Sequence, residues 1–271
     1  MFDWLNQNVI WLVPAGPLAA CLWITLFGQF TRRQAAHRSL VLGLFVSLLS
    51  ALYLLFAVVP QTFVEHGHDD HAAAAVEHAE AGHADEPIAE AAEVPPADAH
   101  AAVASEEHHA PPRSVTFTVY QWFKVGTMDV PVTLRADAMS ALMLVMVTSL
   151  SLLIAIFASS YMHGDPGYPR FFASMSLFVF SMCMLVLAGN FLLMFVFWEA
   201  VGLCSYLLIG FWFKKPSAAA AAKKAFVVNR IGDFGFILGV FLTWTTFGTL
   251  DFQQLFEDPT LINAMVHCWY R

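Results

Sequence analysis

Glu199 is the only charged residue in the apolar run 191–213, which reads FLLMFVFWEAVGLCSYLLIGFWF. The run is long enough to cross a bilayer as a helix. An ionisable group at that depth is costly unless a partner or a water-filled path compensates it, and such groups often mark ion or proton pathways. Glu199 is therefore the leading candidate for a functional residue.

Arg230 and Asp233 lie in the next apolar segment, within the stretch AFVVNRIGDFGF at 225–236. A spacing of three residues places both side chains on one face of a helix, where each can neutralise the other. Two interpretations follow from this spacing. The pair either lowers the cost of inserting both charges into the membrane, or it belongs to one polar file with Glu199.

Three further charged residues lie at expected helix ends. Lys223 and Lys224 precede the segment that holds Arg230, where they either anchor the helix at the membrane surface or supply cations to the polar file. Asp137, in the stretch RADAMS at 135–140, directly precedes another apolar segment. It is suited to cap that helix and to lie at the positive end of its dipole.

The elements that must position these residues are apolar segments of spanning length. The chain is 58% hydrophobic and 13% charged, with a mean hydropathy of +0.62, which is typical of membrane proteins. We predict an all-α polytopic membrane protein, because only helices satisfy their backbone groups at these lengths in lipid. The predicted spans are 9–30, 39–60, 138–159, 171–188, 191–213 and 225–247.

The positions of the cations predict the orientation of these spans. Basic residues gather between segments 1 and 2, between 3 and 4, and between 5 and 6, and the positive-inside rule assigns these loops to the cytoplasm. Both ends of the chain are then expected on the extracytoplasmic side. The residues are Arg32, Arg33, Arg38, Arg170, Lys214, Lys215, Lys223 and Lys224.

Residues 64–113 differ from everything around them, being rich in Ala, His and acidic residues with almost no large apolar side chain. Such a composition predicts a disordered extracytoplasmic insertion. A weak divalent-metal site is the alternative, because imidazoles and carboxylates lie close together in the sequence. Its candidate ligands are His66, His68, His71, His108 and His109.

The remaining divisions of the chain follow from these segments. Residues 114–136 alternate in polarity around a glycine and predict a short extracytoplasmic β-hairpin. The expected regions are therefore 1–63 with two spans, 64–113, 114–136, 137–250 with four spans, and an extracytoplasmic tail at 251–271. The four cysteines show no C-x-x-C spacing, so neither a disulfide framework nor a cysteine metal site is expected. A cleaved signal peptide is not expected either, because the N-terminus lacks a basic region.

Several stretches resemble one family. The blocks WEAVGLCSYLLIGFWF at 198–213, KAFVVNRIGD at 224–233 and GTLDF at 248–252 are similar to subunit L of proton-pumping NADH:quinone oxidoreductase, respiratory complex I. The resemblance runs from about residue 115 to residue 252, which is the N-terminal portion of such a subunit. It implies an antiporter-like fold built from inverted repeats, of which this chain holds an incomplete part.

The resemblance also implies a function and partners. Such subunits are proton channels of the membrane arm, and Glu199 matches the family's key glutamate. Lys224, Arg230 and Asp233 match charged positions in the next helix. The implied partners are other membrane subunits of the complex, especially the neighbouring subunit M, in a bacterial inner membrane. NAD, FMN, iron-sulfur clusters and quinone are then expected in partner subunits, because this chain shows no motif for them.

One departure limits this expectation. The family continues into a broken seventh helix, a second repeat and a lateral helix, and residues 1–271 contain none of these. Because inverted-repeat transporters place their sites between halves, this chain alone is not expected to complete a channel. Two alternatives remain open: the large subunit of a multisubunit sodium/proton antiporter, hydrogenase or inorganic-carbon uptake complex, or a non-conducting membrane scaffold.

Overall fold

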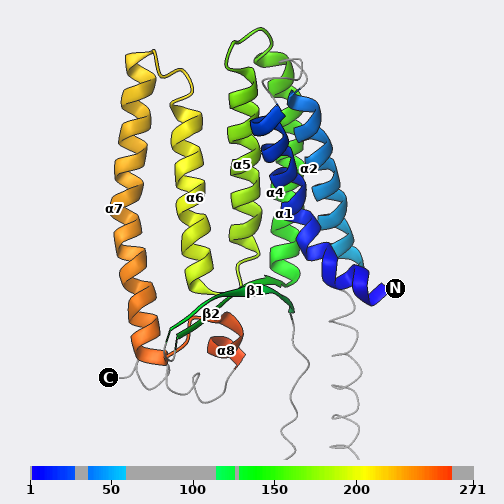
Figure 1. Ribbon diagram of the computed structural model, residues 1–271, viewed down its shortest axis with the longest axis vertical. Helices are drawn as coiled ribbons and strands as arrows, with labels where there is room; N and C mark the ends of the chain where they lie inside the picture. The colour runs from blue at the N-terminus through cyan, green and yellow to red at the C-terminus, as the bar shows by residue number, and fades with distance from the viewer. Residues whose placement is uncertain (1, 28–35, 59–113, 126–127, 258–271) are drawn as a thin grey trace, which may run out of the picture. The chain divides into compact units, whose positions relative to one another are not determined.

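The computed structural model describes residues 2–27, 36–58, 114–125 and 128–257 (Figure 1). Six of its helices are long and apolar enough to cross a membrane, as the sequence predicts. A two-stranded antiparallel hairpin interrupts them. The elements are α1 (Phe2–Phe27), α2 (Ala36–Tyr53) with a π-helical turn (Leu54–Val58), β1 (Val115–Val125), β2 (Met128–Ala136), α4 (Ala138–Tyr161), α5 (Tyr168–Val186), α6 (Phe191–Ile209), α7 (Pro216–Phe247) and α8 (Phe252–Glu257).

The expected insertion at 64–113, with its candidate metal ligands His66, His68, His71, His108 and His109, lies outside the described residues, as does most of the tail. Helix α7 begins at Pro216, earlier than the expected start near residue 225. Lys223 and Lys224 interrupt the apolar run, but the alanines at 218–222 before them have the highest helix propensity, so the helix extends back to Pro216. Proline in the first turn is also favourable, since the N–H group that it lacks would have no partner there.

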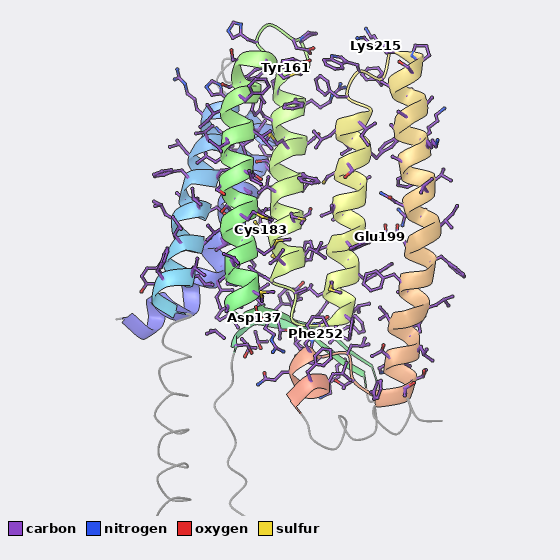
Figure 2. All side chains as sticks on the ribbon, turned by 180° about the vertical axis from the view of Figure 1, so that it is seen from behind. Asp137, Tyr161, Cys183, Glu199, Lys215 and Phe252 are labelled. Atoms are coloured by element: carbon purple, nitrogen blue, oxygen red, sulfur yellow. The ribbon has the colours of Figure 1, made fainter. Side chains whose placement is uncertain are left out.

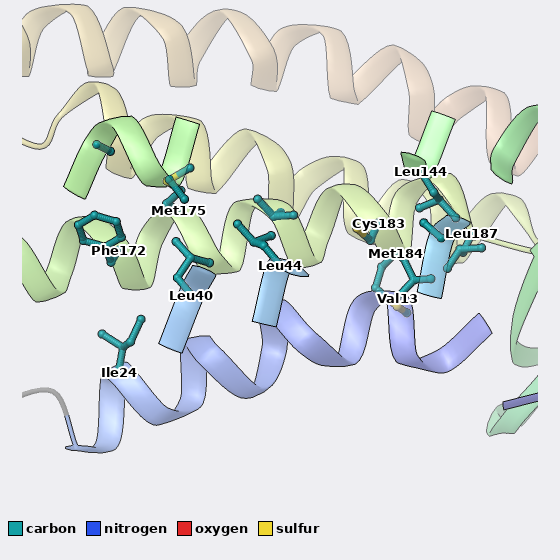
Figure 3. Packing of buried hydrophobic residues seen from close by; sticks show 14 of the residues in the cluster. Val13, Ile24, Leu40, Leu44, Leu144, Phe172, Met175, Cys183, Met184 and Leu187 are labelled. Atoms are coloured by element: carbon teal, nitrogen blue, oxygen red, sulfur yellow. The ribbon is translucent and has the colours of Figure 1, made fainter. Parts of the chain in front are cut away.

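The apolar core lies between α1, α2, α4 and α5, which contact one another in several pairs (Figure 3). Leu40 and Leu44 of α2, Leu144 of α4 and Phe172 of α5 are fully buried in it. Helices α6 and α7 extend this group from α5, with α6 against α5 and α7 against α6. Glu199, Lys224, Arg230 and Asp233 lie in this second part, whereas Asp137 directly precedes α4.

A serine from a neighbouring helix compensates for Pro17 of α1. Pro17 has no N–H, so it leaves the carbonyl of Val13 without its usual helical donor. The hydroxyl of Ser47 in α2, which is fully buried, donates a short hydrogen bond to that carbonyl. Ser176 of α5 donates to the carbonyl of Pro17 at 3.1 Å. In an apolar environment the bond from Ser47 replaces the one that Pro17 removes, and the bond from Ser176 adds a contact between α5 and α1.

The same region of α1 and α2 is held close by two glycines. A Cβ atom added at Gly43 would lie 2.6 Å from the carbonyl oxygen of Gly16, which no side chain can tolerate. The absence of side chains at both positions therefore lets the two backbones touch. This contact brings the Ser47 hydroxyl within reach of Val13.

The hairpin fixes the start of α6. The segment that joins α5 to α6 hydrogen-bonds to β2 on one side, through Arg135 N to Leu187 O at 2.8 Å and Gly189 N to Thr133 O at 2.9 Å. On the other side, Phe252 N donates to Gly189 O at 3.0 Å. Gly248 ends α7 in the left-handed conformation, with φ of 73°, and returns the chain to this point. Both ends of the α6–α7 pair near the hairpin are thereby tied together.

Candidate functional site

Glu199 lies near the middle of α6 and is directed toward α7 (Figure 2). It is about 12 Å along the helix axis from Phe191, at 1.5 Å per residue. Asn190 sets the position of this helix, because its side chain accepts from Leu193 N at 2.7 Å and donates to Pro131 O of β2 at 2.8 Å. The carboxyl group is therefore held at depth by a helix that is anchored at its first turn.

Arg230 of α7 is the ion-pair partner of Glu199. Its Nη1 lies 2.5 Å from Oε2 of Glu199. The guanidinium also lies 4.9 Å from the ring centroid of Phe226, one turn earlier on α7, in a cation–π contact. The side chain of Glu199 is 19% exposed and that of Arg230 is 52% exposed, so the cation is the more accessible member of the pair.

The accessible side of Arg230 opens into an apolar hollow on α7. Phe226, Val227, Ile231 and Phe234 line this hollow together with Arg230. All of these apolar residues belong to α7, so the hollow lies on the surface of α7 rather than in the interface with α6. The guanidinium thus has free space on one side and Glu199 on the other.

Asp233 is the third ionisable member of the cluster. It is only 6% exposed, and its Oδ1 accepts a hydrogen bond of 2.9 Å from the indole Nε1 of Trp198. Its carboxyl group also interacts electrostatically with that of Glu199. Phe236 packs edge-on against the indole ring, with centroids 5.7 Å apart. The α6–α7 interface therefore holds two carboxyl groups, one guanidinium and one indole donor.

The structure brings Glu199, Arg230 and Asp233 together. This proximity is what the interpretation as one polar file requires. It does not form the expected pair within α7: the guanidinium of Arg230 meets Glu199 on the neighbouring helix, and Asp233 takes its hydrogen bond from Trp198. Lys224 lies apart from the three. It is exposed and precedes Arg230 by six residues, which is about 9 Å along the axis and about 120° around it.

Trp198 was not among the residues selected from the sequence. Its position beside Glu199 in the motif WEAVG was visible, but a tryptophan in an apolar run reads as a packing residue. The available signal was chemical, because an indole N–H in a membrane needs an acceptor and Asp233 lay in the next helix. Asp137 fulfils its predicted role in a capping box, accepting from Ser140 N at 2.7 Å while its own N–H donates to Ser140 Oγ at 3.0 Å.

Asp137 lies outside the spans, and its environment favours the charged form. Burial by itself raises the pKa of this carboxyl group. The hydrogen bonds from the hydroxyl and backbone of Ser140, with the positive charge of Arg135, outweigh burial, so that the pKa is lowered from its ordinary value. The cap is therefore an ionised carboxylate at neutral pH.

Two family models match the chain. The N-terminal model of complex I NADH-ubiquinone oxidoreductase chain 5 covers residues 122–172, and the transmembrane model of NADH:quinone oxidoreductases and Mrp antiporters covers residues 188–269. Subunit L of the NADH-quinone oxidoreductase of Neisseria meningitidis serogroup B is 36% identical over 266 residues, or 97% of this chain. Over nearly its whole length the chain is therefore similar to the N-terminal portion of these antiporter-like subunits. Glu199, Arg230, Asp233 and Trp198 all fall within the second match.

The sequence similarity extends to a second bacterial relative, and the fold is shared with two solved structures. Subunit L of Mycobacterium tuberculosis H37Rv is 47% identical over 154 residues, which are 57% of this chain and 24% of that protein. The fold is shared with a chain of the archaeal membrane-bound sulfane sulfur reductase, with a TM-score of 0.64, 18% identity and coverage of 95% and 42% of the two chains. A chain of the Mrp complex of Dietzia has a TM-score of 0.62 and 20% identity, and the match covers 93% of this chain and 21% of that chain.

The helices and these comparisons indicate a multi-pass membrane protein with an antiporter-like fold. The chain spans about a third of the length of its Neisseria relative, because the match covers 32% of that protein. The candidate site therefore lies in the part of the family's sequence that this chain contains.

Proposed function

We propose that this chain is a proton-translocating subunit of the membrane arm of an NADH:quinone oxidoreductase. The observation that carries the proposal is the ion pair between Glu199 and Arg230 across the α6–α7 interface, with the buried carboxyl group of Asp233 beside it. A passive anchor gains nothing from placing three ionisable groups at this depth. A pathway for protons requires such groups.

The charges of the cluster define what it can do. With both carboxyl groups ionised, Glu199, Asp233 and Arg230 sum to one negative charge, and one bound proton makes the cluster neutral. The cluster thus has one exchangeable proton. Two unit charges about 4 Å apart interact by about 4 kcal/mol at an effective dielectric of about 20, which is enough to change proton affinity nearly a thousandfold.

Movement of Arg230 is the proposed control. Its half-exposed side chain borders the hollow on α7, which leaves it space to withdraw from Glu199. Withdrawal removes the cation that stabilises the carboxylate, so a proton is taken up. Return of the guanidinium favours release. Lys224 lies nearer the start of the same helix, where it is proposed to supply a cation to the proton path between the cluster and that end of α7.

The partners and cofactors are part of the proposal. We assign NAD, FMN, iron-sulfur clusters and quinone to partner subunits, with subunit M as the neighbour, in a bacterial inner membrane. The end of the helices that carries Lys215 and Tyr161 also carries Arg38, Arg170 and Lys214, which supports a cytoplasmic location for it (Figure 2). The hairpin end is then extracytoplasmic.

A second candidate is the large subunit of a multisubunit sodium/proton antiporter. It is favoured by the family model that matches residues 188–269, which spans both NADH:quinone oxidoreductases and Mrp antiporters. Purification of the native complex separates the two. Co-purification of flavin and iron-sulfur subunits supports the oxidoreductase, and a set of antiporter subunits without redox centres contradicts it.

Replacement of Glu199 by Gln tests the proposed role directly, because it removes the charge with little change in volume. The complex should assemble, while NADH-driven proton uptake by inside-out membrane vesicles should fall. Asp251→Asn is the matched control, since it removes a carboxylate outside the spans, where Asn still caps α8. An unchanged ratio of protons to electrons in the Glu199→Gln complex would refute the proposal.

A further inference from the structure

The two carboxyl groups of the cluster interact with each other, but each accepts from a different N–H donor. Glu199 is held by the guanidinium of Arg230, at 2.5 Å, whereas Asp233 is held by the indole of Trp198, at 2.9 Å. The first donor is a half-exposed, flexible cation, and the second is a neutral ring. This difference assigns different roles to the two acids.

We propose that Trp198 is a positioning residue that keeps Asp233 ionised and thereby leaves the exchangeable proton on Glu199. This inference rests on the proposed function, because it concerns the proton that the cluster would carry. An indole N–H is a donor only. It therefore binds a carboxylate oxygen directly, and its bond is stronger when that acceptor is charged.

The indole is fixed in place on both helices. It belongs to α6, and the ring of Phe236 on α7 meets it edge-on, 5.7 Å away. Phe236 lies three residues after Asp233, on the same face of α7, and also meets Phe195 of α6 edge-on at 5.6 Å. The aromatic contacts thus hold the ring beside Asp233 wherever the side chain of Arg230 lies.

On its exposed side Arg230 contacts an aromatic ring of its own helix, that of Phe226 at 4.9 Å, rather than a ring pair that joins the two helices. The charged groups that face Asp233 are Glu199 from α6 and Arg230 from its own helix, with Lys223 and Lys224 nearer the end of α7. When Arg230 leaves Glu199, that carboxylate loses its ion-pair partner, but Asp233 retains the indole. A proton entering the cluster is then bound by Glu199.

The test is infrared spectroscopy on the purified native complex, titrated across the pH range in which it turns over. A protonated carboxyl group has a C=O stretching band that a carboxylate lacks. In the native complex this band should vanish in the Glu199→Gln variant, and it should shift to lower frequency when glutamate side chains, but not aspartate side chains, carry ¹³C-labelled carboxyl groups. In Asp233→Asn the Glu199–Arg230 pair is neutral without a bound proton, so the band should appear only at lower pH. In Trp198→Phe, which keeps an aromatic ring but lacks the donor, a new band should form that is lost when Asp233→Asn is added.

Trp212→Phe is the matched control. The indole of Trp212 also donates to an aspartate, Asp165, at 3.2 Å, but both lie in the loop region beyond the spans. This variant should leave the carboxyl band unchanged. The pH profile of NADH-driven proton uptake supplies a second measurement: it should move toward higher pH in Trp198→Phe, because Asp233 then takes a proton more readily, and stay in place in Trp212→Phe.

Three outcomes overturn the inference. The first is a native band that is kept in Glu199→Gln and shifts with ¹³C-labelled aspartate rather than labelled glutamate. This outcome can be measured even if Trp198→Phe fails to assemble. The second is the absence of any protonated carboxyl band in the native complex. The third is a Trp198→Phe complex with the native band and pH profile. Failure of the proposed function can be distinguished from these outcomes, because it would be measured as an unchanged ratio of protons to electrons in the Glu199→Gln complex.

Discussion

Arg230 places its guanidinium 2.5 Å from the carboxylate of Glu199, on the neighbouring helix, rather than on Asp233 three residues along its own helix. The charge of Arg230 therefore links α6 to α7. An ion pair within α7 would have left the two helices free to move without electrostatic consequence. A pair across the interface makes the relative position of the helices and the protonation of Glu199 depend on each other.

Charge reversal across this interface separates assembly from pumping. Glu199→Arg alone places two guanidinium groups in contact, where like charges repel by about 4 kcal/mol at an effective dielectric of about 20. Assembly of the complex should fail. Adding Arg230→Glu restores the opposite pair, so assembly should return, but pumping should stay low because the carboxyl group now lies on α7, apart from its place beside Trp198. Native gels and NADH-driven proton uptake measure the two properties, and full recovery of pumping would contradict the site.

Ser47→Ala should destabilise the packing of α1 and α2. The substitution leaves the carbonyl of Val13 unsatisfied in a buried site, which costs about 1–3 kcal/mol. Thermal unfolding of the detergent-solubilised chain should report the loss. Ser50→Ala is the control, because the Ser50 hydroxyl bonds to Val46 O in its own helix, which has a helical donor already. Equal losses in both variants would contradict the role of Ser47.

Asp137→Ala should cost about 0.5–2 kcal/mol through loss of the α4 cap. The pKa of this carboxyl group is lowered in the folded chain, so its contribution is fully present above the ordinary aspartate pKa of about 3.9. The contribution fades as the pH falls through the lowered value, where the folded form also becomes protonated. The stability difference between the native chain and Asp137→Ala should therefore shrink in acid, and a difference that grows on acidification would contradict the assignment.

Local chemistry was readable from the chain itself. The six spans follow from length and hydropathy, because lipid requires an apolar helix of about 20 residues. The cap at Asp137 depends on neighbours three residues away, and Glu199 is conspicuous as a lone charge in an apolar run. The start of α7 lies earlier than hydropathy predicts, because Lys223 and Lys224 interrupt the apolar run while the alanines before them continue the helix.

The partners of the charged groups required the tertiary structure. A spacing of three residues indicates that Arg230 and Asp233 share a face, but the rotation and register of α6 against α7 decide which group each one meets. That register is set by distant contacts. Among them are the hydrogen bond from Asn190 to Pro131 of the hairpin and the aromatic packing of Phe236 against Trp198. The separation of Lys224 from the cluster and the hydrogen bond from Trp198 to Asp233 depend on the same register. The register of α6 against α7 cannot be read from the periodicity of either helix, because it arises from the packing of side chains between the two helices.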